Sequence, residues 1–289
     1  MNAYQPLTDA EVRLHDGRRI GYAIWGDPSG QPAVLCHGSP ASRLFAPDPV
    51  VTAKRGLRLI TVDRPGYGRS SPKLGRTFVD WVEDLIQLLD QLEVDTVSMV
   101  AHSSGGPYAL ACASLLSMVG RVVLVSTIAP LDVGGAPATF SDDPSEVELV
   151  ELARRNPDQA RAVIAGAAGW LAEDPDRFLD LPRPEPDSQL LQQPDVKSMF
   201  MSTIREAVRQ GVDGYATDEV LCRRPWGFEV GAIGRQVSIW HGAQDVGVTP
   251  AHASALDGMM PQSQVHFDPA QGHGLILARW TDIAAELVA

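Results

Sequence analysis

One serine of this chain lies where a reactive hydroxyl can be exposed, between an apolar strand pattern and a helix pattern. The segment reads Val97-Ser98-Met99-Val100-Ala101-His102-Ser103-Ser104-Gly105-Gly106. Small residues two positions before and after Ser103 allow a turn so tight that a larger side chain would clash. The usual pattern is G-x-S-x-G, and Ala101 replaces its first glycine. The segment predicts a nucleophile at Ser103, and a glycine-rich turn without chemistry is the alternative.

An acid and a histidine near the C-terminal end could activate this serine. Asp245 follows the strand pattern of residues 237–242, and His273 stands between two glycines, where no packing role is obvious. A serine hydroxyl is a weak nucleophile near neutral pH unless a base such as histidine accepts its proton. An aspartate then holds the other ring N–H of the histidine and stabilises the imidazolium. The predicted catalytic residues are therefore Ser103, Asp245 and His273.

Five stretches within residues 37–274 together resemble the α/β-hydrolase fold superfamily, in its branch of capped single-domain hydrolases. They are His37-Gly38-Ser39-Pro40, Asp63-Arg64-Pro65-Gly66-Tyr67-Gly68-Arg69-Ser70, the turn around Ser103, Gly242-Ala243-Gln244-Asp245 and Gly272-His273-Gly274. The chain order serine, acid, histidine is also the order of that superfamily, and it differs from the trypsin and subtilisin types. The resemblance implies a serine hydrolase without identifying its substrate.

Two backbone N–H groups are expected to hold the oxyanion. The resemblance supplies Ser39 for one of them. Ser104 supplies the other, because it follows the nucleophile and opens a helix whose positive end stabilises negative charge.

Other residues compete for the catalytic roles. Ser104 could be taken for the nucleophile, but Ala101 and Gly105 would then lose their spacing. Asp132 follows another predicted strand, where some members of the superfamily place the acid, and Asp268 is a weaker rival.

Strand and helix patterns alternate along the chain up to Ser126. Residues 77–92 have apolar residues at helical spacing, with Thr77 as the N-cap. A hairpin is predicted around Asp16-Gly17, and buried strands are predicted at residues 34–36, 57–62, 122–125 and from Val97. Such alternation predicts an α/β fold with a mostly parallel central sheet and helices on both faces. Active sites of these folds gather at the carboxyl ends of the strands.

The alternation stops after Ser126. Residues 131–225 show no convincing strand, and helices are expected around residues 144–155, 157–171 and 197–209, with an extended proline-rich connector at 181–186. We therefore expect a core of residues 1–130 and 226–289 with an inserted helical cap at 131–225. Most apolar side chains of this cap should pack on the sheet, and the rest should line an apolar pocket above Ser103.

Composition and net charge limit the classes of partner that the protein is expected to bind. The 289 residues are 44% hydrophobic and carry a formal net charge of −12, which disfavours nucleic acid and anionic membranes. No apolar stretch is long enough to span a membrane, and the N-terminus lacks an apolar signal core, so a cytoplasmic protein is expected. The three cysteines, Cys36, Cys112 and Cys222, have neither disulfide nor zinc spacing. We expect the protein to need no metal and no organic cofactor and to act on a small-molecule substrate. A homodimer is a possible oligomeric state.

The expected activity is hydrolysis of an ester, lactone or related acyl bond of a small, largely apolar substrate through an acyl-enzyme. A carbon–carbon bond hydrolase of the same fold, or a ligand-binding or receptor-like protein, are the alternatives. No cluster of basic residues suggests a clamp for a phosphate, although Arg43, Arg64 and Arg69 could lie at the rim of the site.

Overall fold

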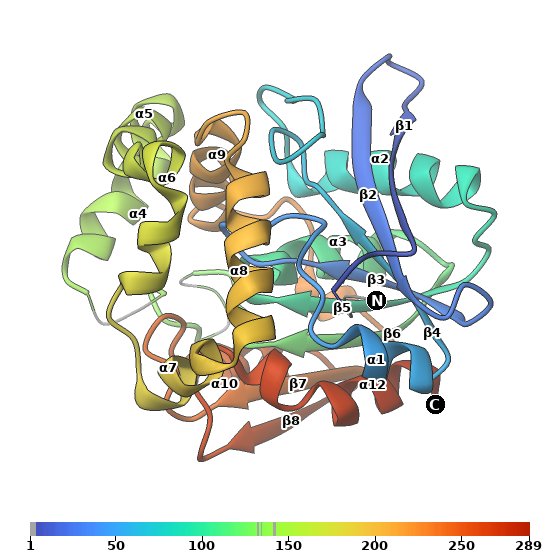
Figure 1. Cartoon of the computed structure of the whole chain (residues 1–289). Coiled ribbons are helices and arrows are strands. Elements are labelled where there is room, and N and C mark those ends of the chain that lie inside the picture. Colours follow the sequence, from blue (N-terminus) through green and yellow to red (C-terminus); the bar gives the residue numbers. More distant parts are fainter. Residues whose placement is uncertain (1–3, 132, 134, 141–142) are drawn as a thin grey trace.

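The strand patterns of the sequence come together in one sheet. The structure is a computed structural model that describes residues 4–131, 133, 135–140 and 143–289. In the part of the chain described, the sheet has eight strands in the order β1-β2-β4-β3-β5-β6-β7-β8 (Figure 1). The strands are β1 (Thr8–Arg13), β2 (Arg19–Gly26), β3 (Gln31–Cys36), β4 (Leu57–Val62), β5 (Val97–His102), β6 (Val119–Val125), β7 (Val237–Gly242) and β8 (Ser263–Asp268).

The sheet is mostly parallel, as predicted. Strand β2 runs antiparallel to both of its neighbours, β1 and β4, and the remaining pairs are parallel. Cys36 pairs with Ala101, and Val125 pairs with both His102 and Trp240. The carboxyl ends of β3, β5, β6 and β7 therefore meet at one edge of the sheet, where the fold class predicts an active site.

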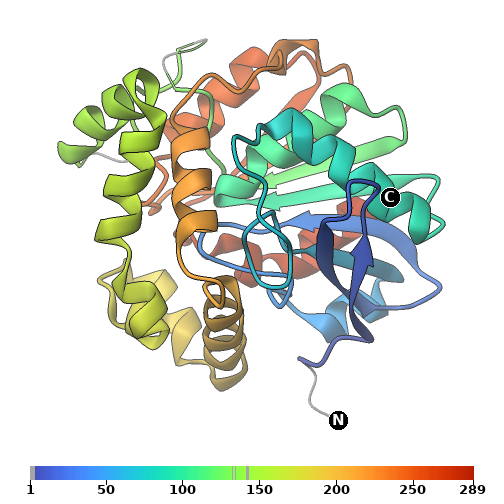
Figure 2. The same ribbon diagram turned by 90° about the horizontal axis from the view of Figure 1, so that it is seen from above.

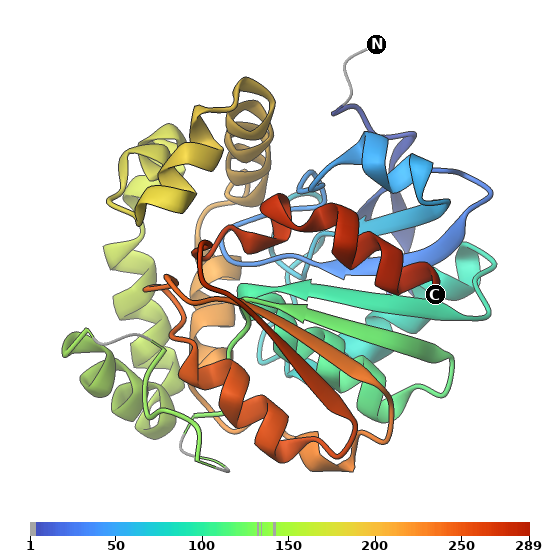
Figure 3. The same ribbon diagram turned by 90° about the horizontal axis from the view of Figure 1, so that it is seen from below.

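Helices cover both faces of the sheet because its central strands are apolar on both sides. In β3, Val34 and Cys36 pack in one core and Ala33 and Leu35 pack in the other. Helices α2 (Phe78–Gln91), α3 (Gly106–Leu115) and α10 (Ala251–Met259) cover the first face. Helices α1 (Pro49–Lys54), α11 (Leu275–Ala278) and α12 (Trp280–Val288) cover the second, and Figure 3 shows α12 in red lying along the sheet.

Several local predictions are confirmed. Thr77 caps α2 in a capping box with Asp80, and the hairpin turns at Gly17, which has a φ of 86°. All three cysteines, Cys36, Cys112 and Cys222, are buried in the same apolar core. None of the helices described is both long enough and apolar enough to cross a membrane.

A group of helices is inserted in the chain between β6 and β7 and lies beyond the carboxyl ends of the strands (Figures 1 and 2). We call residues 143–222 the helical insertion. It contains α4 (Ser145–Arg155), α5 (Pro157–Ala167), α6 (Trp170–Glu173), η2 (Pro175–Asp180), α7 (Glu185–Gln192), α8 (Pro194–Ala207) and α9 (Asp213–Cys222). A short 3₁₀ turn, η3 (Val230–Ala232), precedes β7. The helical character of this segment is confirmed, and its status as a separate cap with the expected boundaries stays a prediction.

Two details of the insertion differ from the sequence prediction. The helix expected over residues 157–171 is interrupted, since Ala168 and Gly169 separate α5 from α6. The connector expected over residues 181–186 is extended only as far as Pro184, because α7 begins at Glu185. Pro186 does not prevent this helix, since the first turn of a helix needs no N–H from its residues.

A buried carboxylate ties the insertion to the sheet. Asp218 of α9 is fully buried and accepts hydrogen bonds from Arg64 and Arg76, at 2.6 Å and 2.8 Å, and from the hydroxyls of Tyr67 and Tyr108. Burial raises the pKa of Asp218, but the two guanidinium groups more than offset this effect and its net pKa is lowered. The carboxylate is therefore ionised and compensated inside the protein.

Candidate active site

Ser103 occupies the tight turn that the sequence predicts. It follows β5 directly, begins the 3₁₀ turn η1 (Ser103–Gly105), and has a φ of 54° in the left-handed region, which is rare for a residue with a side chain. A Cβ on Gly105 would lie 2.0 Å from the Cys36 carbonyl oxygen, which explains the small residue two positions later. Thr127 donates a 2.6 Å hydrogen bond to the Ser103 carbonyl and holds the turn.

Asp245 and His273 are brought together by the loops that follow β7 and β8. The Nδ1 atom of His273 lies 2.7 Å from Oδ2 of Asp245, and the Asp245 Oδ1 atom accepts N–H groups of Gly247 and Val248 at 2.9 Å each. Burial raises the pKa of Asp245, but His273 and the other donors around it more than offset this, so its pKa lies far below the usual value. The carboxylate therefore stays ionised and fixes Nδ1–H as the hydrogen-bond donor of the ring.

The same contacts set the basicity of His273. Burial lowers the pKa of this half-buried ring, but the negative charge and hydrogen bond of Asp245 outweigh burial, and the net pKa is raised. Its Nε2 atom makes no hydrogen bond to any residue that the structure describes, and Ser103 and His273 line the same two cavities. Nε2 is thus left without a partner beside cavities that Ser103 also lines, although the serine and the histidine are not hydrogen-bonded to each other in the described structure.

The expected oxyanion groups lie beside the serine. A Cβ on Gly38 would lie 3.1 Å from the Ser103 Cβ, so the turn after β3 runs close to it. Among the described residues, neither the Ser39 nor the Ser104 backbone N–H has a hydrogen-bond acceptor. The hydroxyl of Ser104 donates a hydrogen bond to Ser39 Oγ at 2.9 Å, so this side chain links the two turns that flank the site. Two unpaired N–H donors next to Ser103 fit an oxyanion hole.

Of the two rival acids, Asp268 lies within the described residues and is not a partner of His273. Asp268 pairs with Arg279 at 2.6 Å and accepts the Ala270 N–H at 2.9 Å. Asp132 lies outside the described residues, and its alternative role is untested.

The three arginines that could have lain at the rim of the site line neither cavity. Arg43 is buried against Asp63 and Glu206, and Arg69 pairs with Asp9 at 3.1 Å. Arg64 is buried against Asp218 and donates to Ser39 Oγ at 2.8 Å, so it holds the turn after β3 and does not face the cavities. Each of these guanidinium groups is paired with a carboxylate whose position the sequence did not reveal.

Two contacts to the histidine loop were missed in the sequence. Asp187 of α7 accepts the backbone N–H of His273 at 3.1 Å and that of Gly274 at 2.7 Å. A Cβ on Gly272 would lie 2.5 Å from Asp187 Oδ2, so the glycine before His273 makes room for this carboxylate. The glycines around His273 were the available signal, because they indicate a close approach without naming the partner.

His102 holds the other side of the histidine loop. Burial and the neighbouring His273 lower the pKa of His102 to about 3, so it is neutral, and its Nε2–H donates to the His273 carbonyl at 3.0 Å. His102 also lines the larger cavity, so it is a wall residue of the site.

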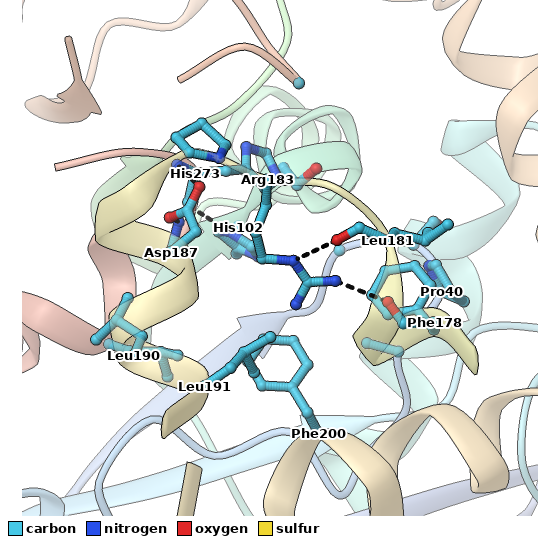
Figure 4. Close-up of a pocket in the computed structure, with 18 of the residues that line it drawn as sticks. Pro40, His102, Phe178, Leu181, Arg183, Asp187, Leu190, Leu191, Phe200 and His273 are labelled. Atoms are coloured by element: carbon cyan, nitrogen blue, oxygen red, sulfur yellow. Dashed lines mark hydrogen bonds between the residues drawn. The ribbon is translucent and has the colours of Figure 1, made fainter. Parts of the chain in front are cut away.

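Two cavities open on Ser103 and His273. The larger, of about 300 Å³, lies between the sheet and the helical insertion (Figure 4). Two charged side chains, Arg183 and Asp187, line it, but its walls are mainly apolar. The apolar lining residues include Pro40, Phe45, Phe178, Leu181, Leu190, Leu191, Phe200 and Leu277. The smaller, of about 230 Å³, is lined in part by three charged side chains: Glu146 and Glu219 of the insertion, and Arg223, which follows it directly. The described residues contain no group of three or more His, Cys, Asp or Glu side chains placed to hold a metal ion.

Comparison with known proteins agrees with this architecture. The sequence profile of the Alpha/beta hydrolase family matches residues 33–286. The uncharacterized hydrolase YcgS of Bacillus subtilis is 31% identical over 104 residues, which are 36% of this chain and 36% of that protein. The non-heme chloroperoxidase CPO-A1 of Kitasatospora aureofaciens is 36% identical over 126 residues, 40% of this chain and 43% of that protein. The chain thus spans less than half the length of these curated relatives.

Solved structures match over almost the whole chain. A hydrolase from Pseudomonas aeruginosa PA01 superposes with a TM-score of 0.72 at 20% identity and covers 97% of both chains. An enol-lactonase from Burkholderia xenovorans LB400 superposes with a TM-score of 0.68 at 22% identity, over 96% of this chain and 98% of that one. These likenesses show the fold, and the profile match extends across both parts of the sheet and the helices between them. The chain therefore belongs to the alpha/beta hydrolase family.

Proposed function

We propose that this hydrolase cleaves an ester, lactone or related acyl bond of a small, largely apolar substrate through an acyl-enzyme on Ser103. The observation that carries the proposal is the 2.7 Å contact between His273 and Asp245, which leaves Nε2 free beside cavities that Ser103 also lines. A base oriented by a buried acid, beside a serine that lines the same cavities, is the arrangement that nucleophilic acyl transfer needs.

The geometry supports the following sequence of steps. Ser103 Oγ attacks the acyl carbon while its proton passes to Nε2 of His273, and the N–H groups of Ser39 and Ser104 stabilise the oxyanion. His273 then gives this proton to the departing alkoxide, which leaves Ser103 acylated. Water repeats the sequence, with His273 as the base, and releases the acid. Asp245 stays ionised throughout and stabilises the imidazolium.

Covalent labelling tests the assignment of the nucleophile. A fluorophosphonate probe followed by peptide mapping should label Ser103, and Ser103→Ala should abolish both the label and ester turnover. Ser104→Ala is the matched control, since the neighbouring hydroxyl is predicted to have no nucleophilic role. Label on Ser104, or none on folded protein, would contradict the proposal.

Kinetics separate the enzyme from its alternatives. A p-nitrophenyl ester should give a burst of chromophore followed by steady turnover, as expected for an acyl-enzyme. Binding without turnover would favour a ligand-binding protein, and turnover restricted to carbon–carbon bonds would favour the other hydrolase class.

A further inference from the structure

One charged side chain lies in the wall of the larger cavity without a charged partner. Arg183 belongs to the extended segment between η2 and α7, and its guanidinium lies among Phe178, Leu191 and Phe200 in Figure 4. It forms no salt bridge with a carboxylate in the described part of the chain. An arginine in apolar surroundings is normally paired, so this position is unusual.

The backbone fixes the orientation of this guanidinium. Its Nε atom donates to the Leu181 carbonyl at 3.1 Å, and Nη2 donates to the Phe178 carbonyl at 2.7 Å. The Nη1 atom has no acceptor among the residues described and lies on the side of Leu191 and Phe200 (Figure 4). Two anchored nitrogens thus hold the third as a fixed donor at the cavity wall.

The nearby acid does not satisfy this donor. Asp187 lines the same cavity, but its two oxygens accept the backbone N–H groups of His273 and Gly274. Burial lowers the pKa of Arg183 more than the charges of Asp187 and Asp180 raise it, so the cation is incompletely compensated. Nη1 is therefore open to a ligand oxygen at the cavity wall, and a hydrogen bond from a charged donor is stronger than one between neutral groups.

Resting on the proposed function, we propose that the acyl group of the substrate is apolar along its length and carries a hydrogen-bond-accepting oxygen, a carboxylate or a ketone, that binds Nη1 of Arg183. The acyl group is assigned to the larger cavity because its walls are mainly apolar, whereas Glu146, Glu219 and Arg223 line the smaller one. This adds a polar far end to the largely apolar substrate that the sequence predicts.

Matched esters test the proposal. Monoethyl esters of succinate, glutarate and adipate are compared with ethyl butanoate, pentanoate and hexanoate, and with ethyl 4-oxopentanoate, by proton release. For at least one chain length, kcat/KM of an oxygenated ester should exceed that of its alkyl partner. Arg183→Met should lower this ratio about tenfold or more, as expected for a hydrogen bond from a charged donor. Whether the carboxylate or the ketone responds identifies the acceptor.

Controls separate recognition from structural damage. Arg177→Met removes a nearby exposed arginine that stacks on Trp170 at 5.3 Å outside the cavity, and the ratio should not change. An alkyl preference in the wild type, or an equal loss of every ester in Arg183→Met, would overturn the proposal.

A binding measurement keeps the proposal independent of turnover. Calorimetry on Ser103→Ala should show tighter binding of an oxygenated ester than of its alkyl partner, and adding Arg183→Met should remove the difference. Equal affinities in Ser103→Ala would overturn the role of Arg183. Absence of fluorophosphonate label in the wild type would overturn the proposed function instead.

Discussion

The chemistry of the site depends on two side chains whose protonation the structure fixes. Asp245 is ionised because its carboxylate receives His273 and the N–H groups of Gly247 and Val248. Its contact holds the imidazole in the tautomer that leaves Nε2 as the acceptor. The sequence predicted this pair from residue order and loop position and ranked Asp268 as a weaker rival, and the contacts of the two acids agree with that ranking.

Replacement of the acid should affect catalysis more than folding. Asp245→Asn should lower kcat by roughly 10²–10⁴, because the amide stabilises the wrong tautomer of His273 and no longer compensates the imidazolium. Asp268→Asn is the matched control, since Asp268 pairs with Arg279 instead. Steady-state kinetics and circular dichroism of both variants measure the effect. A larger loss in Asp268→Asn, or in Asp132→Asn, would assign the acid to that residue.

The activity should rise with pH above the usual range of a histidine. His273 must be neutral to accept the serine proton, and its pKa is raised above 6.5, burial being outweighed by Asp245. The acidic limb of kcat/KM should therefore have its midpoint above pH 6.5. A pH profile with a stable ester measures it, and a midpoint below 6.5 would contradict the assigned electrostatics.

At the scale of elements, α7 is hydrogen-bonded to the loop that carries His273. Its Asp187 bridges two successive N–H groups of the loop that carries His273. The helix has eight residues and contains Pro186, so it lacks the length and periodicity that make a helix predictable. The contact also joins residues 86 and 87 positions apart, which no local pattern can reveal.

Loss of the Asp187 charge should weaken the loop and change its pH response. Asp187→Asn keeps one acceptor oxygen but removes a carboxylate that raises the pKa of His273. We expect a lower kcat and an acidic limb shifted to lower pH. Glu185→Gln, at the exposed start of the same helix, is the control and should change neither. A fall in kcat with an unshifted limb would mean that Asp187 acts only on structure.

At the scale of the whole molecule, the sheet was predictable and the packing of the insertion on it was not. Short strands rich in apolar residues, such as residues 57–62, and small residues around Ser103 determine local structure by themselves. The insertion packs on the sheet partly through apolar side chains such as Met199 and partly through polar contacts between distant segments, above all those of Asp218 with Arg64 and Arg76. Their charges look like ordinary surface residues in the sequence, and their burial emerges only in three dimensions.

Removal of Asp218 should destabilise the molecule strongly. Asp218→Ala leaves two buried guanidinium groups without their carboxylate, and breaking such pairs typically costs about 3–5 kcal/mol. Asp213 lies on the same helix as Asp218, and its exposed carboxylate pairs with Arg161 of α5. Asp213→Ala should therefore cost less than about 1 kcal/mol of the free energy of unfolding. Urea unfolding of both variants compares the free energies of unfolding. Equal effects of the two changes would contradict the anchoring role.

The division of the site into two cavities that share Ser103 and His273 has a kinetic consequence. While the acyl chain stays in the apolar cavity, the alcohol can depart through the charged one, and the next nucleophile can enter by the same route. Product release should therefore be ordered, alcohol first and acid last, with parallel double-reciprocal plots for two substrates. Added methanol should compete with water for the acyl group and divert part of it into a methyl ester, so that the protein acts as a transferase whenever small alcohols are abundant.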